Sequence, residues 1–262
     1  MKFQVNNIKL HVVDEGNQSP VLLFLHFWGG SSRTWTEVAQ LLADRYRTVR
    51  YDHRGWGESD KPESGYDIKT LASDAIELIK QLQLDNYILV GHSMGGKVAQ
   101  YIAAQKPDGL QKLILVAPSP ASPTIFPQEA REQMLRAYTT EEGINITIDQ
   151  VFQAGNIDAQ IRERTIEDIT KHSTASREGW PNFAMLEDVS KGLDNIKVPT
   201  LIIAGENDVI DSPKRLEQEV KDKIPGSSLV IIPKAGHLLM LQSPELVASH
   251  IDTFVKQSSA DK

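Results

Sequence analysis

The chain has no cysteine and no long apolar run. The absence of cysteine among its 262 residues excludes disulfides, thiolate catalysis and cysteine-ligated zinc or iron–sulfur sites. The longest apolar runs, such as residues 21–25 (VLLFL), are far too short to cross a bilayer, and residues 1–7 (MKFQVNN) lack the apolar segment of a signal peptide. We therefore expect a soluble, cytoplasmic protein with no membrane partner.

Basic residues are outnumbered and do not gather into runs. With 28 lysines and arginines against 35 aspartates and glutamates, the formal net charge is -7. This balance argues against nucleic acid as a partner. The length is enough for one large α/β domain, or for a core domain that carries an insertion, and it leaves both a monomer and a homodimer open.

Short apolar runs and helical patterns alternate along most of the chain. Residues 3–5 and 8–13 predict a hairpin at an antiparallel edge. The later runs are continuously apolar, as in strands buried on both faces, so the alternation predicts a mainly parallel sheet of βαβ units. These later strands are expected at residues 21–25, 46–51, 86–90, 113–117, 199–204 and 228–232, with helices at 35–44, 71–82 and 97–105 and after the Ser-Pro pairs at 212–213 and 243–244.

The alternation stops after residue 118 and returns near residue 197. The intervening segment opens with closely spaced prolines and contains helical patterns without a strand-like run, at residues 129–138, 149–154, 158–172 and 180–191. We interpret residues 119–196 as a helical cap over the active face, inserted between core residues 1–118 and 197–262. A helical excursion that merely packs on the sheet is the alternative. The polar residues 258–262 are expected to form a frayed tail.

One serine lies between glycines where a predicted strand ends. Residues 91–96 (GHSMGG) follow the apolar run 86–90 and precede the helical pattern that starts at residue 97. Ser93 is therefore expected at a strand–turn–helix junction, the context of a G-x-S-x-G nucleophile elbow. Glycines permit such a tight turn, which holds the serine backbone in a strained conformation. A serine nucleophile in turn requires a base and an acid elsewhere in the chain.

Among the seven histidines, His237 is the predicted base. Catalytic groups of a parallel sheet gather beyond the C-terminal ends of its strands, and His237 follows the predicted strand 228–232. His26 and His53 also follow strands, but both precede the elbow. His92 adjoins the serine, and neighbouring side chains in that turn point apart.

Asp208 is the predicted acid that orients the histidine. It follows the predicted strand 199–204 in the block GEND, whereas its rival Glu206 lies very close to the strand end. The other rival, Asp211, lies at the start of the Ser-Pro helix, where an acid is normal. The resulting chain order is Ser93, Asp208, His237, which differs from the chymotrypsin and subtilisin orders.

Five sequence blocks in this order resemble those of the α/β-hydrolase family over essentially the whole chain. They are residues 26–30 (HFWGG), 52–59 (DHRGWGES), 91–96 (GHSMGG), 205–208 (GEND) and 236–237 (GH). The chain looks most similar to small bacterial serine carboxylesterases, including arylesterases, and to the related cofactor-free haloperoxidases. The resemblance implies a mainly parallel, eight-stranded α/β-hydrolase sheet with an inserted helical cap. We expect Asp52 and Arg54 to tie loops together near the site without touching substrate.

The resemblance also implies two oxyanion donors, the backbone N–H groups of Met94 and Trp28. Relatives usually carry glycine where this chain has Phe27, so Phe27 either leans into the pocket, reshapes the oxyanion loop or simply packs under the cap. We expect Phe27, His26 and Leu238 to line the substrate pocket.

The serine nucleophile separates this chain from family members that use aspartate, the haloalkane dehalogenases and soluble epoxide hydrolases. Serine forms an acyl-enzyme, which predicts a small carboxylic ester, a lactone or a thioester as the substrate. No cofactor and no metal are implied, because the histidines and carboxylates form no ligand pattern such as H-E-x-x-H. A carbon–carbon bond hydrolase acting on a diketone, and a small-ligand receptor with vestigial hydrolysis, are the alternatives.

Overall fold

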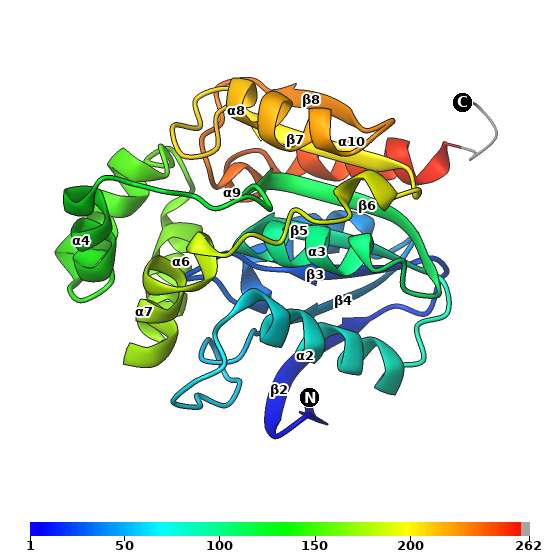
Figure 1. The fold of residues 1–262 in the computed structure, drawn as a ribbon, viewed down its shortest axis with the longest axis horizontal. Coiled ribbons are helices and arrows are strands. Elements are labelled where there is room, and N and C mark those ends of the chain that lie inside the picture. Colours follow the sequence, from blue (N-terminus) through cyan, green and yellow to red (C-terminus); the bar gives the residue numbers. More distant parts are fainter. Residues whose placement is uncertain (258–262) are drawn as a thin grey trace.

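A twisted sheet of eight strands organises the protein, as described by a computed structural model for residues 1–257 (Figure 1). The strand order is β1-β2-β4-β3-β5-β6-β7-β8. Only the β1–β2 and β2–β4 pairs are antiparallel, so the predicted mainly parallel α/β-hydrolase sheet is confirmed. The strands are β1 (Lys2–Val5), β2 (Ile8–Glu15), β3 (Val21–Leu25), β4 (Arg47–Tyr51), β5 (Tyr87–Ser93), β6 (Leu110–Pro118), β7 (Thr200–Gly205) and β8 (Ser228–Ile232). The predicted tail, residues 258–262, lies outside the described residues.

Helices cover the sheet because its central strands are apolar on both sides. Every residue of β3 and β5 is buried, as a strand with both faces covered requires. Helix α2 (Ile68–Gln81) packs against α3 (Met94–Ala104), in front of the sheet in Figure 1, and α1 (Thr36–Leu42) packs against α10 (Pro244–Lys256). The remaining core helices are η1 (Ser32–Trp35), α8 (Pro213–Glu219), η5 (Lys221–Lys223) and α9 (Leu239–Gln242).

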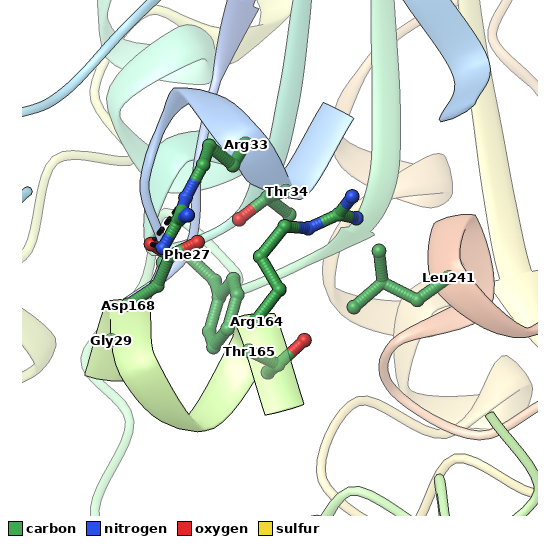
Figure 2. A pocket seen from close by; sticks show the side chains of 9 residues that line it. Phe27, Gly29, Arg33, Thr34, Arg164, Thr165, Asp168 and Leu241 are labelled. Carbon is green, nitrogen blue, oxygen red and sulfur yellow. Dashed lines mark hydrogen bonds and ion pairs between the residues drawn. The ribbon is translucent and has the colours of Figure 1, made fainter. Parts of the chain in front are cut away.

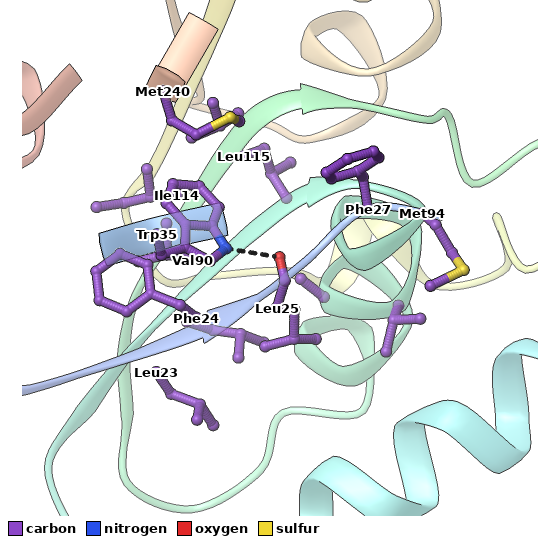
Figure 3. Packing of buried hydrophobic residues seen from close by; sticks show 14 of the residues in the cluster. Leu23, Phe24, Leu25, Phe27, Trp35, Val90, Met94, Ile114, Leu115 and Met240 are labelled. Atoms are coloured by element: carbon purple, nitrogen blue, oxygen red, sulfur yellow. Dashed lines mark hydrogen bonds between the residues drawn. The ribbon is translucent and has the colours of Figure 1, made fainter. Parts of the chain in front are cut away.

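The core continues directly beneath the C-terminal ends of the strands. Phe24 and Trp35 pack with their ring centroids 5.0 Å apart, and the Trp35 indole N–H donates to the Leu25 carbonyl at 3.3 Å (Figure 3). The indole thereby satisfies its one donor inside the apolar layer. These contacts give the loop that follows β3 a rigid base.

Residues 119–196, which we call the cap segment, contain helices and no strand. In Figure 1 its helices α4, α6 and α7 lie together at one end of the sheet. The elements are α4 (Gln128–Ala137), α5 (Glu141–Ile146), the π-helical turn η2 (Thr147–Val151), α6 (Ala159–Thr170), α7 (Thr174–Asn182), η3 (Ala184–Leu186) and η4 (Leu193–Asn195).

Two of the predicted helices in the cap segment are misplaced. The helix expected at residues 180–191 begins earlier, because the Ser173 side chain accepts the Ser176 N–H in a capping box, and it ends at Asn182. The helix expected at residues 149–154 is instead the end of α5 and its π-helical extension. Within residues 1–257, no helix combines the length and the apolar character needed to cross a membrane.

The two connections between core and cap segment run side by side. The Thr124 N–H donates to the Met185 carbonyl at 2.8 Å, and the Val189 N–H donates to the Ala121 carbonyl at 2.9 Å. Lys97 of α3, itself buried, donates to the carbonyls of both connections, at Ser122 and Met185, at 3.1 Å each. One ammonium therefore joins both ends of the cap segment to the helix that follows Ser93.

Candidate active site

Ser93 occupies the strained turn between β5 and α3. Its backbone φ of 50° and ψ of -116° lie in a region that side-chain-bearing residues rarely adopt. The flanking glycines permit the close approach of the helix: a Cβ on Gly91 would lie 2.5 Å from the Gly95 carbonyl oxygen, and one on Gly95 would lie 2.7 Å from that of Leu25. The strand–turn–helix junction expected from the sequence is thus present.

Ser93, His237 and Asp208 form one hydrogen-bonded chain. The His237 Nδ1–H donates to Asp208 Oδ2 at 2.8 Å, and His237 Nε2 lies 2.9 Å from Ser93 Oγ, in position to accept the hydroxyl proton. Ser93 ends β5, and Asp208 and His237 lie in the loops after β7 and β8, so one edge of the sheet brings the three residues together. This arrangement can activate a hydroxyl nucleophile by proton transfer to the imidazole.

The carboxylate and the imidazole stabilise each other's charge. Burial alone would raise the pKa of Asp208, but the charge of His237, its hydrogen bond and the N–H groups of Ile210 and Asp211 hold it below its ordinary value. Burial alone would lower the pKa of His237, but the charge and hydrogen bond of Asp208 raise it. The imidazolium formed during proton transfer is therefore favoured.

The two rival acids have other partners. Glu206 is exposed and accepts the Lys234 N–H at 2.8 Å. Asp211 is fully buried and pairs with Arg215 at 3.1 Å, while Ser119 Oγ donates to it at 3.5 Å. Burial, opposed by the charge of His237 and assisted by that of Asp208, raises the pKa of Asp211 to about 7. Asp211, one of the two acids that the sequence offers as alternatives to Asp208, is thus a second buried carboxyl beside the hydrogen-bonded pair.

The backbone segments of Met94 and Trp28 lie at the same corner of the sheet. Met94 begins α3, whose first N–H groups have no partner within the helix. The close approach of Gly95 to the carbonyls of Leu25 and His26 brings that helix end against the loop after β3. Trp28 is held by its own side chain, which stacks on Tyr138 with centroids 4.2 Å apart and donates from Nε1 to the Arg177 carbonyl at 3.0 Å.

His26 shapes the loop after β3 from behind. Its Nδ1–H donates to the Phe27 carbonyl at 2.7 Å, and its Nε2 accepts the His53 N–H at 2.9 Å. Burial lowers the pKa of His26 to about 4, against the opposing effects of the Phe27 hydrogen bond and the Asp52 charge. Both ring nitrogens are committed to the backbone, which leaves no polar atom of His26 for a ligand.

The cap segment touches the histidine directly. The Phe152 ring stacks on His237 with centroids 5.5 Å apart, and the Phe152 carbonyl accepts the His237 N–H at 2.8 Å. From the elbow, the His92 Nε2–H donates to the His237 carbonyl at 2.9 Å. Gln242 of α9 joins the two loops, because it accepts the Gly236 N–H at 2.8 Å and donates to the Gln153 carbonyl at 3.0 Å.

These contacts at His237 were not anticipated from the sequence. The apolar character of Phe152 is visible there, but its place on the histidine depends on the π-helical turn before it. Gln242 could not be found, because α9 is too short to leave a periodic pattern. Leu238, which follows His237, is fully buried.

The loop of residues 52–59 ties neighbouring loops together, as expected. Asp52 accepts the Ser32 N–H at 2.6 Å and the Glu58 N–H at 2.8 Å. Arg54 makes a buried two-point contact with Asp74, at 2.6 and 2.8 Å. Within residues 1–257, no group of three or more histidine or carboxylate side chains is arranged to hold a metal ion.

A narrow recess, with no room for a water molecule, lies beside the loop after β3 (Figure 2). Neither Ser93, Asp208 nor His237 lines it. Its lining residues are Phe27, Gly29, Gly30, Arg33, Thr34, Arg164, Thr165, Asp168 and Leu241.

A serine in a strained conformation at the end of β5, with an aspartate and a histidine after β7 and β8 of an eight-stranded sheet, is the arrangement of an α/β hydrolase. The model of the alpha/beta hydrolase family matches residues 22–250, and the chain belongs to this family.

Individual relatives agree with this assignment. The AB hydrolase superfamily protein YisY of Bacillus subtilis (strain 168) is 31% identical over 260 residues, which cover 95% of this chain and 96% of that protein. The solved esterase EaEST from Exiguobacterium antarcticum superposes with a TM-score of 0.89 at 25% identity, over 98% of this chain and 99% of that one. A bromoperoxidase from Bacillus anthracis shares the fold with a TM-score of 0.90 at 24% identity, over the same shares. The protein is a hydrolase of this superfamily, and the resemblance to small bacterial esterases and haloperoxidases is confirmed.

Proposed function

We propose that the protein is a serine hydrolase that cleaves small carboxylic esters, or the related lactones and thioesters, through an acyl-enzyme. The observation that carries this proposal is the unbroken hydrogen-bonded chain from Ser93 Oγ through His237 to Asp208. The likeness to a solved bacterial esterase supports the choice of an ester as substrate.

The proposed reaction has two halves. Ser93 Oγ attacks the acyl carbon as its proton passes to His237 Nε2, and Asp208 stabilises the resulting imidazolium. The N–H groups of Met94 and Trp28 stabilise the oxyanion of the tetrahedral intermediate. His237 then protonates the departing alcohol, which leaves an acyl group on Ser93. Water, deprotonated by His237, attacks that acyl group and releases the carboxylic acid with Ser93 restored.

A small acyl group suits the crowded surroundings of the histidine. Phe152 covers His237 from the cap segment, and Phe27 packs against both Phe152 and His92 with ring centroids 5.7 and 5.2 Å apart. Aromatic side chains thus fill the space on one side of the hydrogen-bonded chain. For this reason, we propose that the cap segment forms the lid of the substrate pocket.

Replacing the nucleophile tests the proposal. Ser93→Ala should lower kcat for p-nitrophenyl acetate by roughly 10⁴-fold or more, because the acyl-enzyme can no longer form. The control Ser190→Ala changes a serine whose side chain bonds to Asp188 in a surface loop, and should keep full activity. Undiminished hydrolysis by Ser93→Ala would refute the assignment. Cleavage of a vinylogous diketone in preference to all esters would instead identify a carbon–carbon bond hydrolase.

A further inference from the structure

The backbone N–H of Trp28 belongs to a peptide unit whose carbonyl is held in place. That carbonyl, on Phe27, accepts the His26 Nδ1–H at 2.7 Å and the Gly30 N–H at 3.0 Å. In a trans peptide the N–H points away from the carbonyl, so the Trp28 N–H is directed away from these two partners. Within residues 1–257 it donates to no acceptor, although Trp28 is buried and buried N–H groups are nearly always paired. Such a donor is available to a developing oxyanion.

The cap segment holds Trp28 from the other side. The Tyr138 hydroxyl donates to the Trp28 carbonyl at 2.9 Å, and the tyrosine ring stacks on the indole with centroids 4.2 Å apart. The indole Nε1–H donates to the Arg177 carbonyl at 3.0 Å. Tyr138 directly follows α4 and Arg177 lies on α7, so two helices of the cap segment hold one residue of the core loop.

Gly29 allows the carbonyl of Trp28 to meet the tyrosine. Its φ of 103° lies in the left-handed region that favours glycine, and an added Cβ would lie 2.8 Å from Tyr138 Cε2 and from its hydroxyl oxygen. Only 2% of Tyr138 is exposed. Burial raises the pKa of Tyr138 well above its ordinary value, so the hydroxyl stays protonated and keeps donating over the pH range of the reaction.

We propose that Tyr138 is a positioning residue that keeps the Trp28 N–H aligned with the oxyanion by anchoring the Trp28 carbonyl to the cap segment. The inference rests on the proposed esterase function and gives the cap segment a part in the chemical step. Tyr138 itself touches no reacting atom. Without the hydroxyl, the main chain at Trp28 and Gly29 is free to rotate, and a misaligned N–H stabilises the oxyanion less.

The ring of Tyr138 is held independently of its hydroxyl. Trp56 of the core meets the ring edge-on, with centroids 6.4 Å apart and the planes inclined by 89°, while Trp28 stacks on it. Tyr138→Phe therefore leaves the ring between two indoles and removes only the hydrogen bond. The variant separates the effect of the hydroxyl from that of the packing.

The test measures the chemical step and the binding of a transition-state analogue. Tyr138→Phe should lower kcat for p-nitrophenyl acetate roughly tenfold, a part of the 10²–10³-fold cost of losing an oxyanion donor. KM should stay within about twofold, because the lost interaction acts in the transition state. The Ki of a phenylboronic acid, whose adduct on Ser93 places an oxygen where the oxyanion forms, should rise by a similar factor.

Tyr46→Phe is the matched control. The buried Tyr46 hydroxyl donates to Asp252 at 2.8 Å, and Tyr46 precedes β4, at the edge of the sheet opposite Ser93. This variant loses the same kind of hydrogen bond as Tyr138→Phe. It should keep the wild-type kcat and the wild-type Ki, even where it lowers the melting temperature.

The possible outcomes separate the two proposals. A folded Tyr138→Phe with wild-type kcat and Ki overturns the inference, whatever its melting temperature, and so does a higher KM at unchanged kcat. If Tyr138→Phe does not fold, a crystal structure of the wild-type protein with the boronic acid decides. A boronate oxygen bonded to the Trp28 N–H supports the inference, and its absence from that position overturns it.

If the wild-type protein hydrolyses no ester, the proposed function fails separately. Crystal structures of the wild-type protein and Tyr138→Phe then decide about the tyrosine. A displaced Trp28 main chain in the variant supports its positioning role, and an unmoved one overturns it.

Discussion

Asp211 shows how one buried side chain can tune the chemistry of another. Its carboxyl lies beside the Asp208–His237 pair, and its negative charge contributes to raising the pKa of His237. In the proposed reaction, His237 must be neutral to accept a proton from Ser93, so activity is expected to be lost as pH falls through the pKa of the imidazole. Because the carboxyls and the imidazole are coupled, the observed pKa belongs to the group as a whole.

We predict that Asp211→Asn shifts the acid limb of the kcat/KM profile to lower pH. The neutral amide no longer favours the imidazolium, so the pKa of His237 falls and the base stays active in more acidic solution. The measurement is a pH–rate profile with p-nitrophenyl acetate. The control Glu206→Gln changes an exposed acid directly after β7. It should leave the acid limb of the profile at the same pH. An acid limb at the same pH or at a higher pH in Asp211→Asn would contradict the role given to this carboxyl.

At the scale of elements, sequence patterns predict the sheet better than the cap segment. The strands Val21–Leu25 and Ser228–Ile232 have the predicted bounds, because a short apolar run between turn residues is typical of a strand. The pattern over residues 180–191 is misleading because tertiary contacts override it. After Asn182 the chain turns back, and Met185 pairs with Thr124 of the outgoing connection.

The candidate site follows the same division. Ser93, Asp208 and His237 could be selected because each lies at or shortly after the C-terminal end of a strand and the chemistry requires those three side-chain types. Phe152 and Gln242 could not, since their contacts with the histidine loop depend on how the cap segment folds back over the core. Sequence periodicity carries no information about such a distant pairing.

Lys97 provides a prediction about the elements that it joins. We expect Lys97→Met to lower the free energy of unfolding by about 1–3 kcal/mol, because the buried carbonyls of Ser122 and Met185 lose their donor. Urea denaturation followed by circular dichroism measures the change. Lys80→Met, at an exposed position on α2, should change stability by no more than about 0.5 kcal/mol. Equal free energies of unfolding for the two variants would show that the Lys97 hydrogen bonds do not stabilise this junction.

At the scale of the molecule, cap segment and core are joined by charge as well as by packing. Asp168 of α6 is buried and accepts hydrogen bonds from Ser31 Oγ at 2.8 Å and Arg33 Nε at 2.7 Å, both on the core side. Glu167 also pairs with Arg33, at 3.1 Å, but is exposed. Asp168 and Glu167 thus both pair with Arg33, but Asp168 is buried and Glu167 is exposed.

We predict that Asp168→Asn destabilises the protein by about 1–3 kcal/mol and raises KM for esters, because the contact between α6 and the loop after β3 loses its charge. Glu167→Gln removes an equal charge at the surface and should cost less than about 1 kcal/mol. Urea titrations and steady-state kinetics on both variants make the comparison. A larger loss from Glu167→Gln than from Asp168→Asn would reverse this ranking.

The pairing of the two connections to the cap segment has a consequence for how such a protein can diverge. Since the Val189 N–H donates to the Ala121 carbonyl at 2.9 Å, the cap segment leaves and rejoins the core at neighbouring positions. A segment of another length or shape could be exchanged there without moving a strand. A replacement segment would still have to provide a contact like that of Phe152 on His237. The surroundings of this histidine therefore restrict which segments can be exchanged.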